Sequence, residues 1–279
     1  MSKVVIIRDE KHPLLEQIER YAKKQGVKID TVYWKETTLY NFKDTTVVFM
    51  DRMGELYNTY ETQIIWLNEM LNDMNIQIVN DPQIYFWMRN KILSYIKFTE
   101  MGFDIPKSIV ITNKRQLETL SSGKYIAKPY LGTCSDGVIP FTAKNVSEDI
   151  IDMLKRDGMI LVQEFITNPD RYIWRVDVVN GEIVQINQRY AYNCDEQFPI
   201  CNGTYGGKIN VISPMDTPKD VRNFINSIYE KIGLEIMGVD FLIDENQKLW
   251  LLEINPEPDI TCDFKGFPNK IADYLISLM

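Results

Sequence analysis

Residues 238–256, GVDFLIDENQKLWLLEINP, predict the β-hairpin around which the chain is organised. Two runs rich in β-branched and aromatic residues flank a polar turn. A hairpin of this length brings Asp240 near Glu253 and Asn255, and the last two share a face because they lie two residues apart. Carboxylates on one apolar face repel each other unless a cation lies between them, and oxygen ligands favour Mg²⁺ or Mn²⁺ over zinc.

The same acidic residues also fit a simpler interpretation, in which a buried hairpin carries its acids at the sheet edge. A lone Asp or Glu in a strand is most often of that kind. Three acceptors at this spacing, followed by Pro256 and Pro258 to end the strand, favour the metal site.

The succession Gly-Val-Asp-Phe, a hairpin, then Leu-Glu-Ile-Asn-Pro-x-Pro-Asp resembles the metal-binding end of the ATP-grasp ligases. The resemblance implies that Asp240, Glu253 and Asn255 hold two Mg²⁺ ions (or Mn²⁺) on the phosphates of ATP. It also implies a fold of α/β and α+β parts. The expected parts are a pre-ATP-grasp α/β domain, a first ATP-grasp lobe with a linker helix, and a second lobe with the metal site, over residues 1–88, 89–168 and 169–279.

The composition is that of a globular protein of 279 residues, of which 45% are apolar and 25% charged. A formal net charge of −8 argues against non-specific nucleic-acid binding, which needs a basic surface. We expect no signal peptide, because the apolar N-terminal run is too short, and no membrane span, because no apolar run is long enough. Four cysteines without a Cys-x-x-Cys pair fit a reduced, cytoplasmic protein, and His12 is the only histidine.

Strands that alternate with helices in the first 88 residues predict a small parallel α/β layer, with ligands at the carboxyl ends of its strands. The expected strands are 4–7, 27–34, 45–50 and 76–79, and the expected helices are 14–25 and 56–74. Arg52 follows the third strand and is either a solvated loop cation or an anion contact for the substrate. The ribosomal-protein glutamate ligase branch of the ATP-grasp enzymes has a similar Arg-x-Gly, which implies the substrate contact.

Two lysines and a glycine-rich loop are candidates for binding phosphates. Lys128 ends the strand 124–129 among apolar neighbours, where a lysine loses hydration unless an anion meets it. Residues 132–138, GTCSDGV, form either an ordinary turn or a loop whose backbone N–H groups surround phosphate oxygens. By resemblance, Lys91 at the start of the next domain's first helix, Lys128, and Ser135 in the loop contact ATP.

Residues 160–166, ILVQEFI, form a strand that becomes polar toward its end. Taken by itself, this segment is a core strand followed by a turn. The ATP-grasp family uses it as the adenine hinge. The resemblance therefore implies that Gln163 and the backbone groups of Glu164 and Ile166 contact the adenine, and that Asp170 binds the ribose hydroxyls.

Residues 173–189 form a second hairpin around an Asn-Gly turn, the strongest two-residue turn signal. Arg175 and Arg189 lie on its two arms, either as exposed strand charges or as site cations. In the glutamate-ligase branch, arginines at both places face the phosphoryl and acyl groups, which implies a catalytic role. The loop from Asn202 resembles a substrate loop of that branch and implies a substrate contact for Asn202, although Tyr205 replaces the usual basic residue.

The ordered set implies an ATP- and Mg²⁺-dependent ligase that joins a carboxylate to an amine through an acyl phosphate. An amino acid or peptide is the expected substrate, with no nucleic-acid or membrane partner, and a homo-oligomer stays open. Gly238 agrees with the glutamate-ligase branch, whereas the Asn-Pro-x-Pro-Asp ending is similar to the D-alanine–D-alanine ligases, so no single substrate is assigned. Two alternatives stay open: an ATP-binding regulatory module without ligase activity, and another ATP-grasp chemistry.

Overall fold

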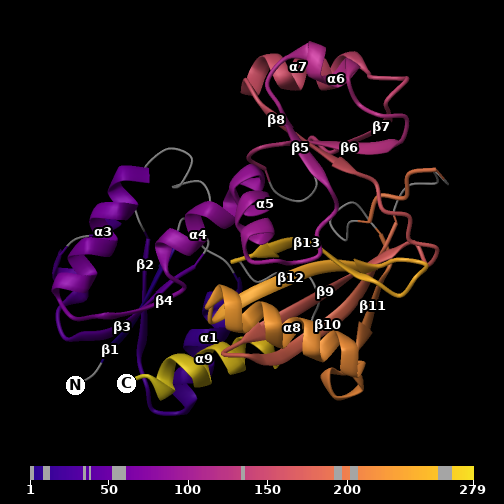
Figure 1. Ribbon diagram of the computed structural model, residues 1–279. Helices are drawn as coiled ribbons and strands as arrows, with labels where there is room; N and C mark the ends of the chain where they lie inside the picture. Colours follow the sequence, from indigo (N-terminus) through magenta and orange to yellow (C-terminus); the bar gives the residue numbers. More distant parts are fainter. Residues whose placement is uncertain are drawn as a thin grey trace.

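The described part of the chain forms three β-sheets with helices packed around them, as the computed structural model shows (Figure 1). A parallel sheet at the N-terminus lies beside a longer antiparallel sheet, and a small antiparallel sheet stands over the longer one. The structure describes residues 3–8, 13–33, 36–37, 39–51, 61–132, 136–191, 197–201, 207–256 and 266–279.

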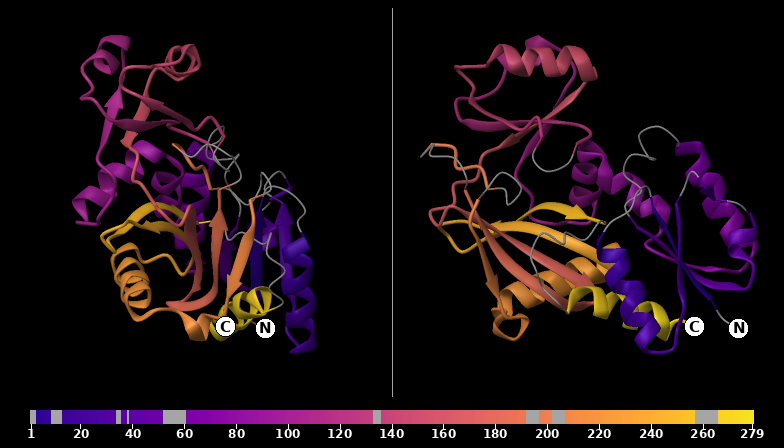
Figure 2. Two further views of the ribbon diagram at one scale, coloured as in Figure 1. Left: turned by 90° about the vertical axis from the view of Figure 1, so that its right-hand side faces the viewer. Right: turned by 180° about the vertical axis from the view of Figure 1, so that it is seen from behind.

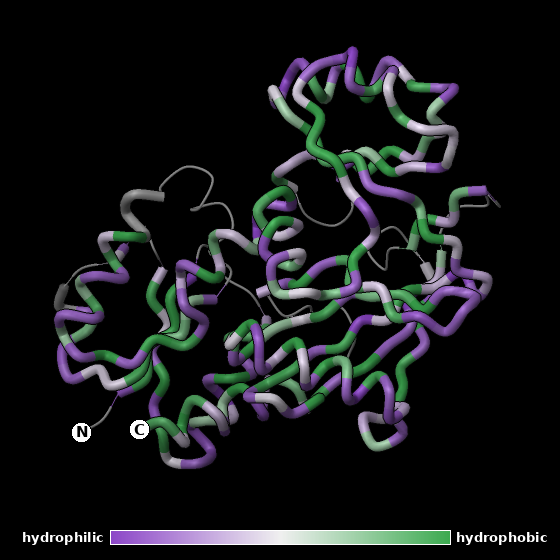
Figure 3. The backbone as a smooth tube through the Cα atoms, in the orientation of Figure 1, coloured by the Kyte–Doolittle hydropathy of each residue, from purple (hydrophilic) through white to green (hydrophobic). Residues whose placement is uncertain are grey.

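The N-terminal sheet has the strand order β2-β1-β3-β4, and all of its pairings are parallel. Its strands are mainly hydrophobic (Figure 3), because helices cover both faces and leave no polar side. This confirms the predicted parallel layer. Its elements are β1 (Lys3–Arg8), α1 (Pro13–Lys24), β2 (Ile29–Tyr33), η2 (Leu39–Phe42), β3 (Thr45–Met50), α3 (Glu61–Asp73) and β4 (Gln77–Val79).

Two short helices, α4 (Pro82–Arg89) and α5 (Lys91–Glu100), connect this sheet to the rest of the chain. The predicted helix that starts at Lys91 is α5, whereas α4, which the sequence analysis omitted, ends directly before Asn90. The side chain of Asn90 accepts hydrogen bonds from the backbone N–H groups of Ile92 and Leu93, so it caps the second helix. The cap places Lys91 at the first position of α5.

The small sheet has the strand order β5-β8-β6-β7 and is antiparallel throughout. Helices α6 and α7 cover one face of it, and the opposite face turns toward the central sheet (Figure 1). The sequence analysis omitted β7 and both helices. The elements are β5 (Ser108–Ile111), α6 (Lys114–Glu118), β6 (Lys124–Pro129), β7 (Ile139–Thr142), α7 (Glu148–Asp157) and β8 (Ile160–Glu164).

The central sheet has the strand order β11-β10-β9-β12-β13 and contains both predicted hairpins. The apolar side of α8 packs against one face of this sheet, with Val221 and Ile225 in a buried cluster with Val176 and Phe241. The elements are β9 (Tyr172–Val179), β10 (Glu182–Tyr190), β11 (Ile209–Ile212), η3 (Pro214–Asp216), α8 (Lys219–Ile232), β12 (Ile236–Ile243), β13 (Leu249–Asn255) and α9 (Phe267–Ser277).

The end of the chain returns to its beginning, since α9 packs beside α1 and both termini lie on one side of the molecule (Figure 2). Asn80, directly after β4, joins the N-terminal sheet to the central one. Its side-chain amide donates hydrogen bonds to the carbonyl oxygens of Ile236 and Pro256, at 2.9 and 3.2 Å. The carboxyl edge of the N-terminal sheet is therefore held beside the end of β13. Among the described helices, none has the length and apolarity that crossing a membrane requires.

Candidate active site

One face of the central sheet carries a set of polar side chains. They share this face because directly paired residues of an antiparallel ladder point to the same side of the sheet. Arg175 on β9 lies opposite Asn187 on β10 and opposite Asp240 on β12. Asp240 in turn lies opposite Glu253 on β13. The face consists of Arg175, Asp177, Gln185, Asn187, Arg189, Gly238, Asp240, Glu253 and Asn255. Since α8 covers the other face, this polar face is the one available for chemistry.

The structure brings together the three oxygen ligands that the hairpin sequence predicts. Asn255 donates a hydrogen bond from Nδ2 to Oδ2 of Asp240 at 2.9 Å, and Glu253 is the register partner of Asp240. Arg175 donates from Nη1 to the same Oδ2 at 3.0 Å. The other oxygen of Asp240, Oδ1, is buried and accepts no hydrogen bond.

A buried carboxylate oxygen without a donor is costly unless a cation meets it. The oxygen donors of Asp240, Glu253 and Asn255 therefore fit Mg²⁺ or Mn²⁺. The described residues contain no cluster of three or more His, Cys, Asp and Glu side chains, as expected when the third ligand is an asparagine.

A β-bulge distorts the ladder at this point. The register between β12 and β13 shifts after Asp240, which pairs with Glu253, while Phe241 pairs with Leu251. Leu252 is thus the extra residue, and it lines a pocket together with Glu253. Bulges commonly re-aim side chains beside active sites.

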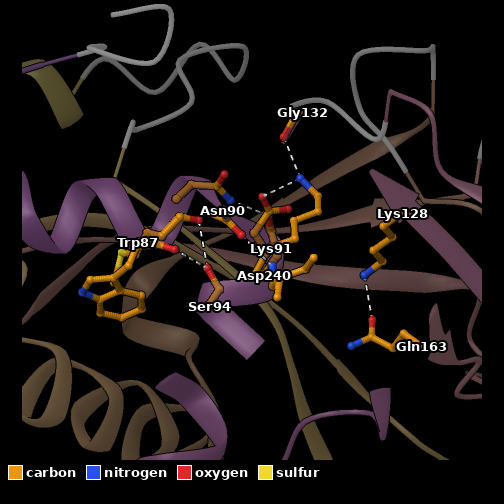
Figure 4. A network of polar contacts seen from close by, with 12 residues as sticks. Trp87, Asn90, Lys91, Ser94, Lys128, Gly132, Gln163 and Asp240 are labelled. Atoms are coloured by element: carbon orange, nitrogen blue, oxygen red, sulfur yellow. Dashed lines mark hydrogen bonds and ion pairs between the residues drawn. The ribbon is translucent and has the colours of Figure 1, made fainter. Parts of the chain in front are cut away.

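The candidate site lies between the central sheet and the small sheet, which form its two walls. Lys128 on β6 belongs to the small sheet. Its Nζ donates a hydrogen bond of 2.7 Å to Oε1 of Gln163 on β8 (Figure 4). Burial lowers the pKa of Lys128 to about 8, an effect that Glu253 opposes and Lys91 reinforces. A half-buried lysine whose direct partner is a neutral amide is suited to bind an anion.

Lys91, at the start of α5, lies between the two walls. Its Nζ donates to the carbonyl oxygen of Gly132 at 2.6 Å and lies 3.8 Å from Oε1 of Glu253 (Figure 4). Its backbone N–H also donates to the carbonyl oxygen of Tyr130. These contacts hold the lysine between the strand that carries Lys128 and the acidic hairpin.

A pocket with an empty volume of about 430 Å³ opens between these walls. Charged and amide groups converge on it from both sides, namely Lys91, Lys128, Gln163 and Glu253. Its remaining lining is mostly apolar: Met88, Ser94, Tyr95, Phe98, Ile105, Leu161, Leu251 and Leu252. An apolar cavity with a few convergent polar groups is the usual form of a small-molecule site.

The predicted adenine-contact residues lie at the end of β8. Gln163 donates from Nε2 to Oγ of Ser108 at 3.0 Å while it accepts from Lys128, so its orientation is fixed. The backbone N–H of Glu164 is already used, because it donates to the carbonyl oxygen of Lys107 at 2.8 Å. Ile166 is half-buried just beyond the strand, and Asp170 is exposed in the turn before β9. Their roles toward adenine and ribose stay predictions.

The two predicted arginines occupy different environments. Arg189 is half-buried on β10 and donates from Nε to Oδ1 of Asn187 at 3.3 Å. Arg175 is only 2% exposed, and it donates to Asp177 at 2.8 Å and to Asp240 at 3.0 Å. Two carboxylates thus contact the guanidinium, and the predicted roles of both arginines toward the phosphoryl and acyl groups stay predictions.

Three further candidates, Arg52, Ser135 and Asn202, lie outside the described residues, as do Tyr205 and the Asn-Pro-x-Pro-Asp ending beyond Pro256. Their predicted contacts with the substrate and with ATP stay predictions.

The sequence analysis missed the polar residues beneath the acidic cluster. Asp177 and Asn187 are 0% exposed, and Gln185 is 1% exposed. A usable signal was present, since polar residues recur at every second position within apolar strands, in RVD on β9 and QINQR on β10. Such a pattern places the polar side chains on one face of the sheet.

Comparisons with known proteins agree with this geometry. The chain is 26% identical over 192 residues to a protein of Parasynechococcus marenigrum named a probable alpha-L-glutamate ligase, which covers 67% of this chain and 40% of that protein. It spans 40–44% of the length of the first three curated relatives that it matches.

Solved structures with the same fold cover nearly the whole chain. The D-cycloserine synthetase DcsG superposes with a TM-score of 0.74 at 13% identity, over 99% of this chain and 100% of that one. A RiPP-associated ATP-grasp ligase of Chryseobacterium gregarium, in complex with ADP and a leader and core peptide, superposes with a TM-score of 0.73 at 16% identity, over 100% and 98%. The RimK-like ATP-grasp domain matches residues 88–278, well over half of the chain, and the protein therefore belongs to the RimK-like ATP-grasp family.

Proposed function

We propose that this protein is an ATP- and Mg²⁺-dependent ligase that joins a carboxylate to an amine through an acyl-phosphate intermediate. One observation carries the proposal: Lys91 and Lys128 converge with Glu253 on one pocket between the two sheets. Two cations facing a carboxylate cluster with a buried, unpaired oxygen match the needs of a nucleotide phosphate chain with its divalent ion. Membership of the RimK-like ATP-grasp family supports the same assignment.

The lysines and the acidic hairpin have different roles in the proposed site. Lys128 and Lys91 bind the phosphates, while the apolar side chains of the pocket take the base. Asp240, Glu253 and Asn255 hold the divalent cation, which neutralises charge on the phosphates when bound. Arg189 steadies the acyl phosphate, and no protein nucleophile is required, because phosphoryl transfer depends on positioning and charge neutralisation.

The substrate is an amino acid or a peptide. Two kinds of likeness support this class. The curated relatives include several named probable alpha-L-glutamate ligases, and the structural neighbours include ligases bound to precursor peptides. The carboxyl edge of the N-terminal sheet lies beside the end of β13, so the reacting carboxylate can approach the metal site from that side.

The test is Mg²⁺-dependent ADP and phosphate release during a screen of amino acids and short peptides. We expect Glu253→Gln to reduce that release by about 10²–10³-fold, because the variant removes one preorganised charge from the phosphate site. Glu182→Gln is the matched control, since Glu182 is exposed on β10 and pairs with Lys270.

Two outcomes would contradict the proposal. Full activity of Glu253→Gln would refute the metal assignment. ATP binding in calorimetry, without ADP formation across the whole screen, would instead identify an ATP-binding regulatory module.

A further inference from the structure

Arg175 is a buried cation that contacts a proposed metal ligand directly. Its guanidinium lies between Oδ1 of Asp177, 2.8 Å from Nε, and Oδ2 of Asp240, 3.0 Å from Nη1. The Arg175 side chain is 3% exposed and that of Asp177 is 0% exposed. The three side chains thus form a carboxylate–guanidinium–carboxylate row on one face of the sheet, across β9 and β12.

Gly238 creates the space for this row. A Cβ atom at position 238 would lie 2.1 Å from Nη2 and 2.2 Å from Cζ of Arg175. The guanidinium therefore lies over Gly238 on its way to Asp240, and any side chain at position 238 would force it to shift. The glycine that starts the GVDF motif has a specific steric role.

The positive charge of Arg175 in this row is unfavourable for a divalent cation at the proposed site. A guanidinium that donates to one oxygen of Asp240 orients the carboxylate, but its positive charge repels a divalent cation on the other oxygen. The guanidinium and Asp240 are largely shielded from water, with side chains 3% and 11% exposed, so the repulsion is only partly screened. A second negative charge on the far side of the guanidinium offsets this repulsion.

We propose that Asp177 is a positioning residue that supplies this charge. It balances the charge of Arg175, so that Arg175 orients Asp240 while Asp240 keeps its negative charge for the cation. The inference rests on the metal site of the proposed function and adds a residue that does not touch the metal.

Asp177 lies next to the metal-ligand candidate only through Arg175 among the contacts of the described residues, and both of its oxygens accept hydrogen bonds. Oδ1 accepts from Arg175, and Oδ2 accepts from Nε2 of Gln185 at 3.1 Å. Gln185 lies on the neighbouring strand β10 and is 1% exposed, so it fixes Asp177 from the side away from Arg175. Outer partners that orient a metal ligand typically change metal affinity by about 10–100-fold when mutated.

The test uses Asp177→Asn in the full chain. Asparagine keeps the size and an acceptor for Arg175, and removes the charge. Its amide nitrogen replaces the oxygen that accepts from Gln185, whose own buried Oε1 has no partner and can accept instead if the Gln185 amide turns over. We measure Mn²⁺ affinity in the presence of ADP by electron paramagnetic resonance, and the melting temperature of the metal-free protein. We expect Asp177→Asn to weaken Mn²⁺ binding by about 10–100-fold.

The double variant Arg175→Gln/Asp177→Asn removes both charges and should recover part of the lost Mn²⁺ affinity, because the repulsion is gone although Arg175 no longer orients Asp240; a merely structural role would produce no recovery. Asp244→Asn is the matched control on the same hairpin, since Asp244 accepts from Trp250 at 2.9 Å. Asp244 lies four residues, roughly 13 Å, from Asp240 along the strand. This control should leave Mn²⁺ affinity unchanged.

A lower melting temperature with unchanged Mn²⁺ affinity in Asp177→Asn would overturn the inference and leave the metal site intact. A double variant as weak as the single one would also overturn charge balance as the cause. If the wild-type protein failed to bind Mn²⁺ with ADP, the metal site and the role of Asp177 would both be wrong.

Discussion

Two cations, the half-buried Lys128 in the small sheet and the buried Arg175 in the central sheet, have opposite kinds of partner. Lys128 donates to the neutral amide of Gln163. Arg175 donates to two carboxylates, those of Asp177 and Asp240. Both side chains are held in place by hydrogen bonds, so the difference between them is one of charge.

The contrast shows how the fold can use a cation in two ways. A cation beside a neutral partner keeps its charge for an incoming anion, and the lowered pKa of Lys128, about 8, reflects the cost of burying that charge. A cation between two carboxylates is already neutralised, so it serves to orient them. Under the proposed function, the small sheet would bind phosphate and the central sheet would bind a divalent ion.

Gly238→Ala should have the largest effect, because it disrupts the ion pairs of Arg175 with Asp177 and Asp240. The new methyl group would displace the guanidinium of Arg175 and leave buried carboxylates unpaired. We expect the free energy of unfolding to fall by about 3 kcal/mol or more, as for other broken buried ion pairs. Urea denaturation followed by circular dichroism measures this change.

Gly123→Ala provides the control for that substitution, since a Cβ at position 123 would meet the Tyr125 ring at an ordinary 3.4 Å. If Gly238→Ala lost no more stability than Gly123→Ala, the row of Asp177, Arg175 and Asp240 would tolerate displacement of the guanidinium.

Lys128→Met should weaken the proposed phosphate contact on the small sheet. The variant keeps most of the apolar stem but removes the charge that faces the phosphates, so we expect ADP affinity to fall by about 10–100-fold, the contribution of one charged hydrogen bond. Isothermal titration calorimetry measures it. Lys124→Met is the matched control on the same strand, because Lys124 is exposed and lies over the Phe198 ring. Equal losses in both variants would argue against a specific role of Lys128.

The pH dependence of binding should show the smallest effect. Near pH 8 about half of the Lys128 side chains are neutral in the free protein, and phosphate binding favours the protonated form. Binding of ADP should therefore take up as much as about half a proton at pH 8. Calorimetry in two buffers of different ionisation enthalpy measures the uptake, and its persistence in Lys128→Met would assign it to another group.

The same pKa has a consequence for the stability of the free protein. The folded-state pKa of Lys128 lies below its ordinary value of 10.5, so the unfolded chain binds more protons between about pH 8 and 10.5. This group therefore adds to the free energy of unfolding as the pH rises through that interval.

Local sequence pattern was enough for the elements that bear the site. Two runs rich in β-branched and aromatic residues around a polar turn predicted the hairpin of β12 and β13. The two-residue spacing of Glu253 and Asn255 placed them on one face, because side chains along a strand alternate. The Asn-Gly turn predicted the hairpin of β9 and β10. The helical periodicity of residues 14–25 was equally clear and predicted α1.

Only the tertiary structure decided which strands become neighbours. The contact between Arg175 and Asp240 joins residues 65 apart, and the contact between Lys128 and Gln163 joins residues 35 apart. The sequence pattern of a strand predicts on which face of the sheet each side chain lies. Which strands become neighbours depends on how the whole chain buries its apolar surface. For that reason the sequence alone could name Arg175 as a candidate, while the fold showed that it is held between two carboxylates.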